Sequence, residues 1–251
     1  TLHRTRQVRA NASFTSPNVV GGGLSHTIRP GCDLPTEEPF FNALVRSLFA
    51  EGLMPAGSVL DVGARRGETA CLYATFAPER QVHAIDPSAR NVKQIERVYR
   101  RMFPNLKARV GGLGSHYVPQ LSAKVRWNQI TGLSSLIDGD MGAGKEREAS
   151  RPEASQDPTT GDATFPIFTV DDLFSSERLG FAHIDVEGSE LSVLRGARTV
   201  IARDQPIFTI ETHAHVHDPQ PTIELLDFVA SQLGYQLLMV QEVCGIISVC
   251  R

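Results

Sequence analysis

A carboxylate and two glycines stand at the end of the first predicted strand, within residues 58–70, S-V-L-D-V-G-A-R-R-G-E-T-A. Asp61 lies in a short apolar run, which is typical of a buried parallel strand. Gly63 and Gly67 follow, and glycines there permit a tight turn and close approach of backbone to a ligand. A predicted helix comes next, with free N–H groups at its start. The pattern predicts a nucleotide-type binding loop at the carboxyl edge of a sheet, with a plain structural turn as the alternative.

A second carboxylate, Asp86, ends the next predicted strand, 19 residues after Gly67. In nucleotide-binding α/β folds an acidic residue at about this distance accepts hydrogen bonds from ribose hydroxyls. An ionised carboxylate only accepts hydrogen bonds, so it suits two hydroxyl donors. We therefore expect Asp86 to bind ribose, and the alternative is a turn residue before Pro87.

These two carboxylates do not distinguish between a nicotinamide cofactor and an adenosyl cofactor as the ligand. The spacing Gly63-x-x-x-Gly67 departs from the Gly-x-Gly-x-x-Gly of dinucleotide-binding folds. Asp61 lies two residues before the first glycine, and its carboxylate suits a ligand with an ammonium group rather than one with a pyrophosphate. S-adenosylmethionine carries such a group, so the sequence favours a methyltransferase.

Acidic and imidazole side chains follow two later predicted strands, 181–186 and 206–210. The carboxyl ends of neighbouring parallel strands converge on one cleft, so these groups are candidates for proton transfer. Three histidines alternate at positions 213, 215 and 217, which in extended chain places them on one face. The candidate catalytic residues are Asp185, Glu187, Glu211, His213 and His215.

Two chemical interpretations of this group compete with an incidental polar loop. A histidine has an ordinary pKa near 6.5 and suits proton removal near neutral pH, which is the favoured interpretation. Alternatively, Asp185, Glu211 and His213 hold a divalent metal that acidifies the acceptor hydroxyl. His183, inside its strand, is expected to be a core histidine, and His116 to be near an adenine or simply exposed.

Strands and helices must alternate to position these groups, and the apolar pattern predicts that they do. The alternation predicts an α/β fold with a parallel, doubly wound sheet. The expected parallel strands are 58–62, 81–85, 106–110, 181–186 and 206–210. The expected helices are 36–52, 67–76, 88–103, one that carries the apolar positions 193–201 and one across 221–233. The last two expected strands, 235–240 and 245–249, pair as an antiparallel hairpin.

The remaining segments fit one domain with two irregular parts. Residues 1–35 are expected to form an extended N-terminal arm, and residues 36–251 a single methyltransferase domain. Residues 139–164 contain no Ile, Leu, Val or aromatic residue and predict a flexible insertion. Residues 117–118 and 124–127 are expected to form a small hairpin, residues 165–170 a further strand, and Asp171 and Asp172 the start of a short helix.

The composition of the chain limits the classes of partner and compartment that we expect. The 251-residue chain carries a net charge of −3, which gives no overall basic excess for nucleic-acid binding. No apolar run reaches the length of a membrane span. The four cysteines lack Cys-x-x-Cys spacing, so a zinc site is not expected, and their use fits a reducing compartment. A cytoplasmic location is favoured, an upstream targeting segment stays open, and nothing indicates the oligomeric state.

Several strings resemble the FkbM family of S-adenosylmethionine-dependent methyltransferases. They are L-D-V-G-A-R-R-G-E-T (60–69), I-D-P-S (85–88), G-L-S-S-L (132–136), F-T-V-D-D-L (168–173), H-I-D-V-E-G-S-E-L-S-V-L-R-G-A (183–197) and I-E-T (210–212). The resemblance implies a class I, Rossmann-like methyltransferase fold of seven strands, the last antiparallel. One departure is Arg65, where the family usually has Asn, and Arg66 adds a second cation beside it.

The resemblance also implies roles for individual residues. The loop after the first strand would line the methionine end of the donor, the second acidic strand end would hold the ribose, and the stretch after the third strand would lie near the adenine. The implied cofactor-binding residues are Asp61, Gly63, Ala64, Gly67, Asp86, Pro87, Ser88, Gly112, Leu113 and Asp185.

The expected function is methyl transfer from S-adenosyl-L-methionine to a hydroxyl group of a small molecule or sugar. A catalytically silent adenosyl-binding or interaction module is the first alternative, and a nicotinamide-dependent enzyme the second. The expected partner is a small-molecule or glycan acceptor, and nucleic acid is not expected. A divalent metal is possible but not favoured.

Overall fold

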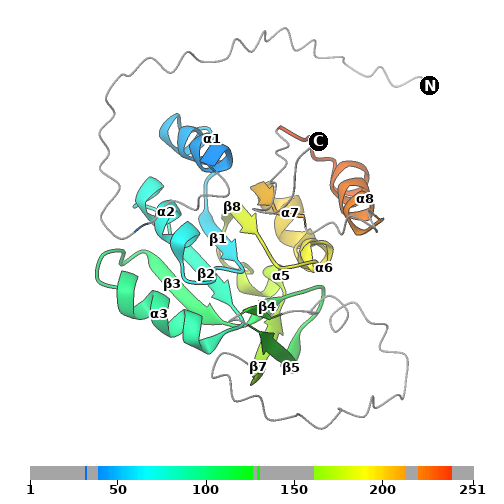
Figure 1. Ribbon diagram of the computed structural model, residues 1–251. Coiled ribbons are helices and arrows are strands. Elements are labelled where there is room, and N and C mark those ends of the chain that lie inside the picture. The colour runs from blue at the N-terminus through cyan, green and yellow to red at the C-terminus, as the bar shows by residue number, and fades with distance from the viewer. Residues whose placement is uncertain (1–31, 33–38, 127–128, 131–160, 213–219, 239–251) are drawn as a thin grey trace, which may run out of the picture.

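Helices and strands alternate along the computed structural model, which describes residue 32 and residues 39–126, 129–130, 161–212 and 220–238 (Figure 1). The first half contains α1 (Pro39–Ala50), β1 (Ser58–Val62), α2 (Glu68–Phe76), β2 (Val82–Asp86), α3 (Ala89–Tyr99), β3 (Leu106–Val110), β4 (Gly112–Leu113), β5 (Val118–Arg126) and β6 (Gln129–Ile130). The second half contains β7 (Gly161–Phe168), α5 (Val170–Leu173), β8 (Leu179–Ile184), α6 (Glu190–Arg195), α7 (Arg198–Asp204), β9 (Ile207–Ile210), α8 (Gln220–Asp227) and the π-helix η1 (Phe228–Gln232). None of these described helices is long and apolar enough to cross a membrane.

The central sheet has five strands in the order β3-β2-β1-β8-β9, and every pairing in it is parallel. This confirms the predicted parallel α/β sheet. The predicted antiparallel hairpin is not confirmed, because residues 235–238 form no strand and residues 239–251 lie outside the described chain. The backbone N–H of Tyr235 donates to the carbonyl of Val229 instead, and its hydroxyl donates to the carbonyl of Pro206. The first bond closes the end of the preceding helix, and the second attaches Tyr235 to the residue before β9.

A second, four-stranded sheet, in the order β4-β7-β5-β6, differs from prediction in two respects. The segment expected to be a small hairpin is one nine-residue strand, β5, which pairs antiparallel with β7. Residues 161–164, which the composition placed in a flexible insertion, begin β7. Small side chains do not prevent pairing, because the backbone supplies the ladder and Phe165 and Ile167 supply the burial. Residues 139–160 lie outside the described chain.

Helices cover both faces of the central sheet (Figure 1). Val59, Val82 and Ala84 pack into one apolar cluster with side chains of α1, α2 and α3. Leu60 and Ile85 pack into another, with side chains of α5 to α8. Successive side chains of a strand point to opposite faces. Asp61 and Asp86 therefore belong to the face that α2 and α3 cover.

The helix predicted from the apolar positions 193–201 is broken into α6 and α7. The break comes at Gly196, where a β-carbon would clash with the carbonyl oxygen of Gly114. The close approach of the segment after β3 thus interrupts a continuous apolar helical pattern. A neighbouring bond, from the N–H of Ser115 to the hydroxyl of Ser192 (3.1 Å), holds the same two segments together.

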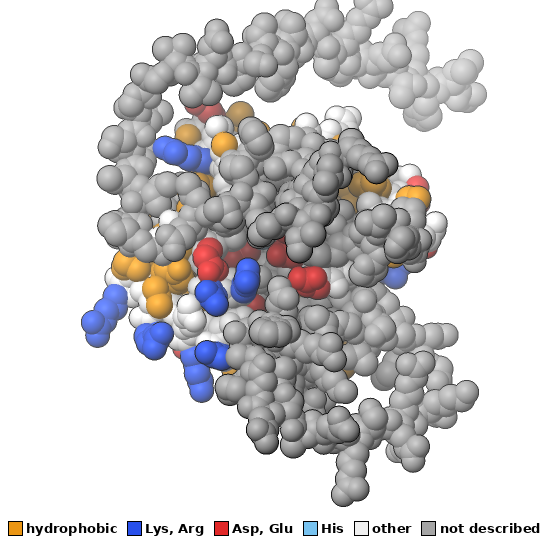
Figure 2. All heavy atoms as spheres, viewed as in Figure 1, with side chains coloured by type: hydrophobic (Ala, Val, Ile, Leu, Met, Phe, Trp, Pro, Cys, Tyr) orange, Lys and Arg blue, Asp and Glu red, His pale blue; other side chains and the backbone are white. Residues whose placement is uncertain are grey.

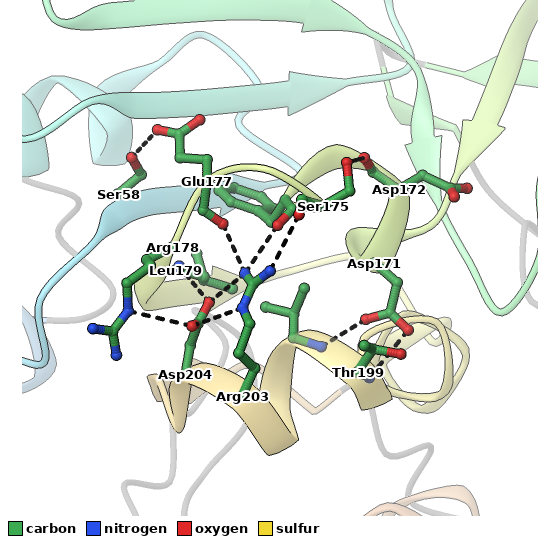
Figure 3. A network of polar contacts seen from close by, with 12 residues as sticks. Ser58, Asp171, Asp172, Ser175, Glu177, Arg178, Leu179, Thr199, Arg203 and Asp204 are labelled. Carbon is green, nitrogen blue, oxygen red and sulfur yellow. Dashed lines mark hydrogen bonds and ion pairs between the residues drawn. The ribbon is translucent and has the colours of Figure 1, made fainter.

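A polar network secures the edge of the sheet at which β8 begins (Figure 3). The guanidinium of Arg203, in α7, donates to the backbone carbonyls of Phe174, Ser175 and Glu177 at 2.9, 3.4 and 2.7 Å. It also binds the buried carboxylate of Asp204, which accepts the N–H of Leu179 at 2.9 Å. The network therefore joins the segment between α5 and β8 to α7.

A disulfide joins Cys32 to Cys71, whose Cα atoms lie 5.7 Å apart. Both cysteines are buried, and Cys71 lies in α2. Cysteine spacing did not predict this pair, and cysteine usage led us to expect a reducing compartment. Disulfides form and persist mainly in oxidising compartments. The pair therefore runs against that expectation.

Candidate active site

Four predicted site positions come into line at the carboxyl edge of the central sheet. The last paired row of strands β2, β1, β8 and β9 is Ile85, Val62, Ile184 and Ile210. The residues that follow them along the chain are Asp86, Gly63, Asp185 and Glu211, respectively. Neighbouring strands lie about 5 Å apart, so the backbones of Asp185 and Glu211 are adjacent and that of Asp86 is about 10 Å from Asp185. The strand order therefore places three residues with carboxylate side chains in one row with Gly63.

Gly63 allows the loop after β1 to touch the loop after β8. Its φ is +81°, and a β-carbon there would clash with the backbone carbonyl oxygen of Asp185. The N–H of Asp185 donates to the carbonyl of Val62 at 3.0 Å, so the two loops also share a hydrogen bond. Only glycine satisfies both the left-handed φ and the close approach. The sequence predicted a close approach of this backbone to a ligand. In the structure the close approach is to the backbone of Asp185.

Gly67 ends the same loop and is the N-cap residue of α2, again in the left-handed conformation. A β-carbon at this position would lie 2.8 Å from the side chain of Ile95 and 3.0 Å from that of Tyr99, both in α3. Gly67 therefore lets α3 pack directly against the start of α2. Ala64, between the two glycines, is buried.

Asp86 fixes the conformation of this loop. One carboxylate oxygen, Oδ2, accepts the backbone N–H of Arg65 at 2.8 Å. The other, Oδ1, accepts the N–H of Ser88 at 2.8 Å and the side-chain amide of Asn91 at 3.0 Å. Ser88 also caps α3 by accepting the N–H of Asn91 at 3.3 Å. Asp86 thus joins the loops after β1 and β2.

Burial raises the pKa of Asp86 to about 6, although its three hydrogen bonds act in the opposite direction. The side chain is 5% exposed. A carboxylate has about four acceptor positions, and three are used here. Within the described part of the chain, one acceptor position on Oδ2 therefore takes no hydrogen bond in this loop conformation.

Asp61 lies 1% exposed beside a buried histidine. The register pairs Asp61 with His183, and His183 with Thr209. The Nδ1 of His183 lies 2.8 Å from the hydroxyl of Thr209, and its ring packs edge-on against Tyr73. Burial lowers the pKa of His183 to about 4, so the imidazole is neutral at neutral pH. The predicted core histidine is confirmed, and it contributes a polar layer beneath the candidate site.

The loop after β8 exposes one acidic side chain and buries another. Glu187 is exposed and has a left-handed φ of +54°. Glu190 is buried, and its carboxylate accepts the N–H of Gly188 at 2.9 Å. Asp185 is half-buried at the mouth of the strand. Of the two predicted acids, Asp185 therefore belongs to the row at the sheet edge, and Glu187 lies on the surface beside it.

The other predicted residues divide into described and undescribed positions. Glu211 is half-buried directly after β9, and its N–H donates to the carbonyl of Ile184 at 2.9 Å. Gly112 and Leu113 are buried in β4, and Pro87 is half-buried. His116 is exposed. The candidate bases His213 and His215 lie outside the described chain.

The metal alternative has no support within the described part of the chain. No group of three or more His, Cys, Asp or Glu side chains in that part is placed to hold a metal ion. The predicted set of Asp185, Glu211 and His213 includes one residue that the structure does not describe.

The sequence did not identify Asn91 or the backbone of Arg65 as partners of Asp86. Asn91 had a usable signal, because a polar residue three positions after a cap lies on the first turn of a helix. The contribution of Arg65 had none, because a backbone N–H carries no sequence signature. Together they make Asp86 the polar centre of the loop.

Comparison with protein families identifies the chain. None of the curated proteins compared is significantly similar to it in sequence. A family model described as the methyltransferase FkbM domain matches residues 61–237, which is most of the chain. The match begins at the buried carboxylate of β1 and includes all three acidic positions at the sheet edge. The chain therefore belongs to the FkbM methyltransferase family, and it is a methyltransferase in general activity.

Proposed function

We propose that this protein is an S-adenosylmethionine-dependent O-methyltransferase that modifies a hydroxyl of a small molecule or sugar. The observation that carries the proposal is the row of Asp86, Gly63, Asp185 and Glu211 at one sheet edge. Ligands of open α/β sheets bind outside the carboxyl ends of the strands. The row provides acceptors for a polar donor at β1 and β2, and candidate proton acceptors at β8 and β9.

The residues present fit an adenosyl donor. Asp86 keeps one acceptor position for a ribose hydroxyl, and Asp61 supplies a buried carboxylate on the same face of the sheet. In this proposal Asp86 binds the ribose, while Asp61, Gly63 and Gly67 line the methionine end. When bound, the donor supplies an activated methyl group on a sulfonium.

The remaining task of the chain is to orient the acceptor and remove its hydroxyl proton. Asp185 and Glu211 stand on adjacent strands, so an acceptor hydroxyl between their side chains would meet a carboxylate. His213 and His215 follow Glu211 within four residues and are the favoured general bases, because an imidazole side chain suits proton removal near neutral pH. A base placed here would take the hydroxyl proton while the acceptor oxygen bonds to the donor's methyl carbon, and the carbon–sulfur bond of the sulfonium would break to leave a neutral thioether.

Calorimetry with S-adenosylhomocysteine tests the donor. We expect binding by the native protein, and a loss of about tenfold or more in Asp86→Ala, because a hydrogen bond to a charged group contributes about 1.5–3 kcal/mol. Glu51→Ala, which removes an exposed carboxylate before the amino end of β1, is the matched control and should bind normally. Binding of a nicotinamide cofactor in place of the adenosyl ligand would overturn the proposal.

Turnover over a panel of hydroxylated acceptors tests the base. We expect His213→Ala or His215→Ala to lower kcat by about a hundredfold or more while the donor still binds. Normal rates in both variants would move the role to Asp185 or Glu211, which Asp185→Asn and Glu211→Gln would then reveal. Donor binding without turnover on any acceptor would instead indicate a silent adenosyl-binding module. Activity that survives exhaustive chelation would exclude the metal alternative.

A further inference from the structure

A row of cations runs along the outer face of α3. Arg90, Lys93, Arg97 and Arg100 follow one another at spacings of three and four residues, which places them on one face of a helix. All four side chains are exposed, and Figure 2 shows Lys and Arg side chains gathered on the side of the molecule where α3 lies. This row, the cationic stripe, extends over roughly 15 Å at 1.5 Å per residue.

The opposite face of α3 is buried, which fixes the direction of the stripe. Val92, Ile95 and Tyr99 are buried, and the last two pack into the apolar cluster that α2 and the central sheet share. Arg100, the C-cap residue, keeps a helical backbone, so the stripe continues to the end of the helix. The cations therefore face away from the sheet.

The stripe carries a local excess of positive charge. Residues 88–101 contain five Lys and Arg and one Glu, in a chain of net charge −3. That Glu, Glu96, stands beside the stripe, one turn before Arg100. Within the described part of the chain, Lys93, Arg97 and Arg100 form no ion pair. Such an excess attracts anions.

The stability of α3 does not account for this pattern. Cations at the end of a helix suit its dipole, but Arg90 stands in the first turn, where anionic side chains are favoured and α3 has none. Lys93 follows Arg90 by three positions and precedes Arg97 by four. Like charges at these spacings destabilise a helix. A bound polyanion would relieve both effects.

One end of the stripe lies at the candidate active site. Ser88, which caps α3, donates its N–H to Asp86, and Arg90 comes two residues later. Two more exposed cations, Arg65 and Arg66, stand on the loop that Asp86 joins to this helix end. Because β2 and β3 are parallel, α3 runs from the carboxyl edge of the sheet back to its amino edge. A chain bound along the stripe would therefore reach the site with one end.

We propose that the cationic stripe binds an extended anionic glycan, whose end brings an acceptor hydroxyl to the site. The inference rests on the proposed O-methyltransferase function. Carboxylate, sulfate or phosphate groups along such a chain would meet Arg90, Lys93, Arg97 and Arg100 in turn, whereas a small anion would use only part of the stripe.

The surroundings of the stripe favour a glycan over two other kinds of polyanion. Single-stranded nucleic acid stacks its bases on aromatic side chains, and Tyr99, the one aromatic residue of α3, is buried. A helix that lies on a membrane turns its apolar face toward the lipid, whereas the apolar face of α3 packs inside the protein. Saturated sugar rings need neither contact.

Fluorescence anisotropy of labelled decagalacturonate, an anionic sugar chain, tests the stripe on the full protein. We expect unlabelled decagalacturonate to displace it at a concentration about tenfold or more below that of the neutral chain maltodecaose. Arg97→Glu should weaken binding about tenfold or more. Arg195→Glu reverses an exposed cation that also lies in the last turn of its helix, α6, and should alter binding less than about twofold.

Three outcomes would overturn the inference. They are equal weakening in the two variants, equal competition by maltodecaose, and tighter binding of phosphatidylglycerol vesicles or of a single-stranded oligonucleotide than of decagalacturonate. If Arg97→Glu does not fold, as thermal unfolding would reveal, Lys93→Glu takes its place with the same expected loss.

Transfer of labelled methyl groups to polygalacturonate, alginate and hyaluronan, with dextran as the neutral control, tests the acceptor role. For a chain that takes label, Arg97→Glu should raise KM about tenfold and leave kcat within about twofold. Label on dextran alone would overturn the substrate class. Failure of the native protein to bind S-adenosylhomocysteine would instead contradict the proposed function, whereas normal donor binding without decagalacturonate binding would contradict this inference alone.

Discussion

Arg65 adopts a left-handed backbone conformation, with a φ of +49°, that a long side chain rarely takes. Its side chain is exposed, and its backbone N–H donates to Asp86. Asn is several-fold enriched in this conformation, so the backbone at this position would suit Asn better than Arg. The loop depends on the direction of one N–H group. Arg65 and Arg66 are accordingly an exposed pair on a loop whose function lies in its backbone.

In the proposed donor complex, the raised pKa of Asp86 would make donor binding depend on pH. Ribose hydroxyls would donate to the ionised carboxylate, and burial moves its pKa from 3.8 to about 6 in the folded protein. As pH falls through 6, the group takes up a proton and the ionised form becomes scarce. We expect S-adenosylhomocysteine to bind roughly tenfold more weakly near pH 5 than near pH 8. Calorimetry across this range measures the change.

Asp86→Asn is the control for this profile, because the amide does not titrate. Its affinity should be lower throughout and nearly constant between about pH 5 and 8. A flat profile in the native protein, with normal affinity, would contradict the assignment of the ribose to an Asp86 of raised pKa.

At the scale of elements, the loops after β1 and β8 form a single unit through Gly63. Gly63→Ala should destabilise the protein by about 3 kcal/mol or more, because its β-carbon displaces the backbone of Asp185 in addition to straining φ. Gly52→Ala is a matched control: its φ is +67°, and a β-carbon there meets nothing within 4 Å. It should cost only about 1–2 kcal/mol, the penalty of the left-handed backbone. Urea denaturation of both variants gives the two values, and equal losses would contradict the contact.

The elements also show what sequence alone could predict. Strands β1 and β3 were both predicted with their observed bounds. β1 is a short apolar run and β3 alternates apolar and cationic residues, and both patterns indicate a strand in a chain that alternates strands with helices. The break at Gly196 and the long strand β5 were missed, because each depends on a segment distant in sequence. The acidic positions at the sheet edge were found from strand ends alone. Asn91 and the N–H of Arg65 were not, since their role depends on where Asp86 points.

At the scale of the whole molecule, the Cys32–Cys71 disulfide connects the segment before α1 to the helix that begins at Gly67. It spans 39 positions, and closing a loop of that length stabilises a fold by roughly 4 kcal/mol on the chain-entropy estimate. We expect a reductant to lower the urea midpoint of the native protein. Cys32→Ala should show the lower midpoint without reductant and no further change with it. Equal midpoints of the native protein under both conditions, with free thiols verified by mass spectrometry, would contradict this role.

The edge at which the strands of the central sheet begin and the edge at which they finish have different roles. The network around Arg203 and Asp204 secures the end where β8 begins (Figure 3), whereas the candidate site occupies the end where the strands finish. Substitutions in the network should change the free energy of unfolding more than donor affinity. The reverse should hold for exposed positions at the site, such as Glu187.

The contact between Gly63 and the carbonyl of Asp185 has a consequence for recombination between related enzymes. A chimera with one crossover anywhere between these positions takes its first loop from one parent and its second from the other. The fit of the two loops is then left to chance, although each parent sequence is intact on its own side of the junction. Exchanging residues 58–67 and 183–190 together keeps the contact within one parent, and chimeras built in that way should retain their folded yield.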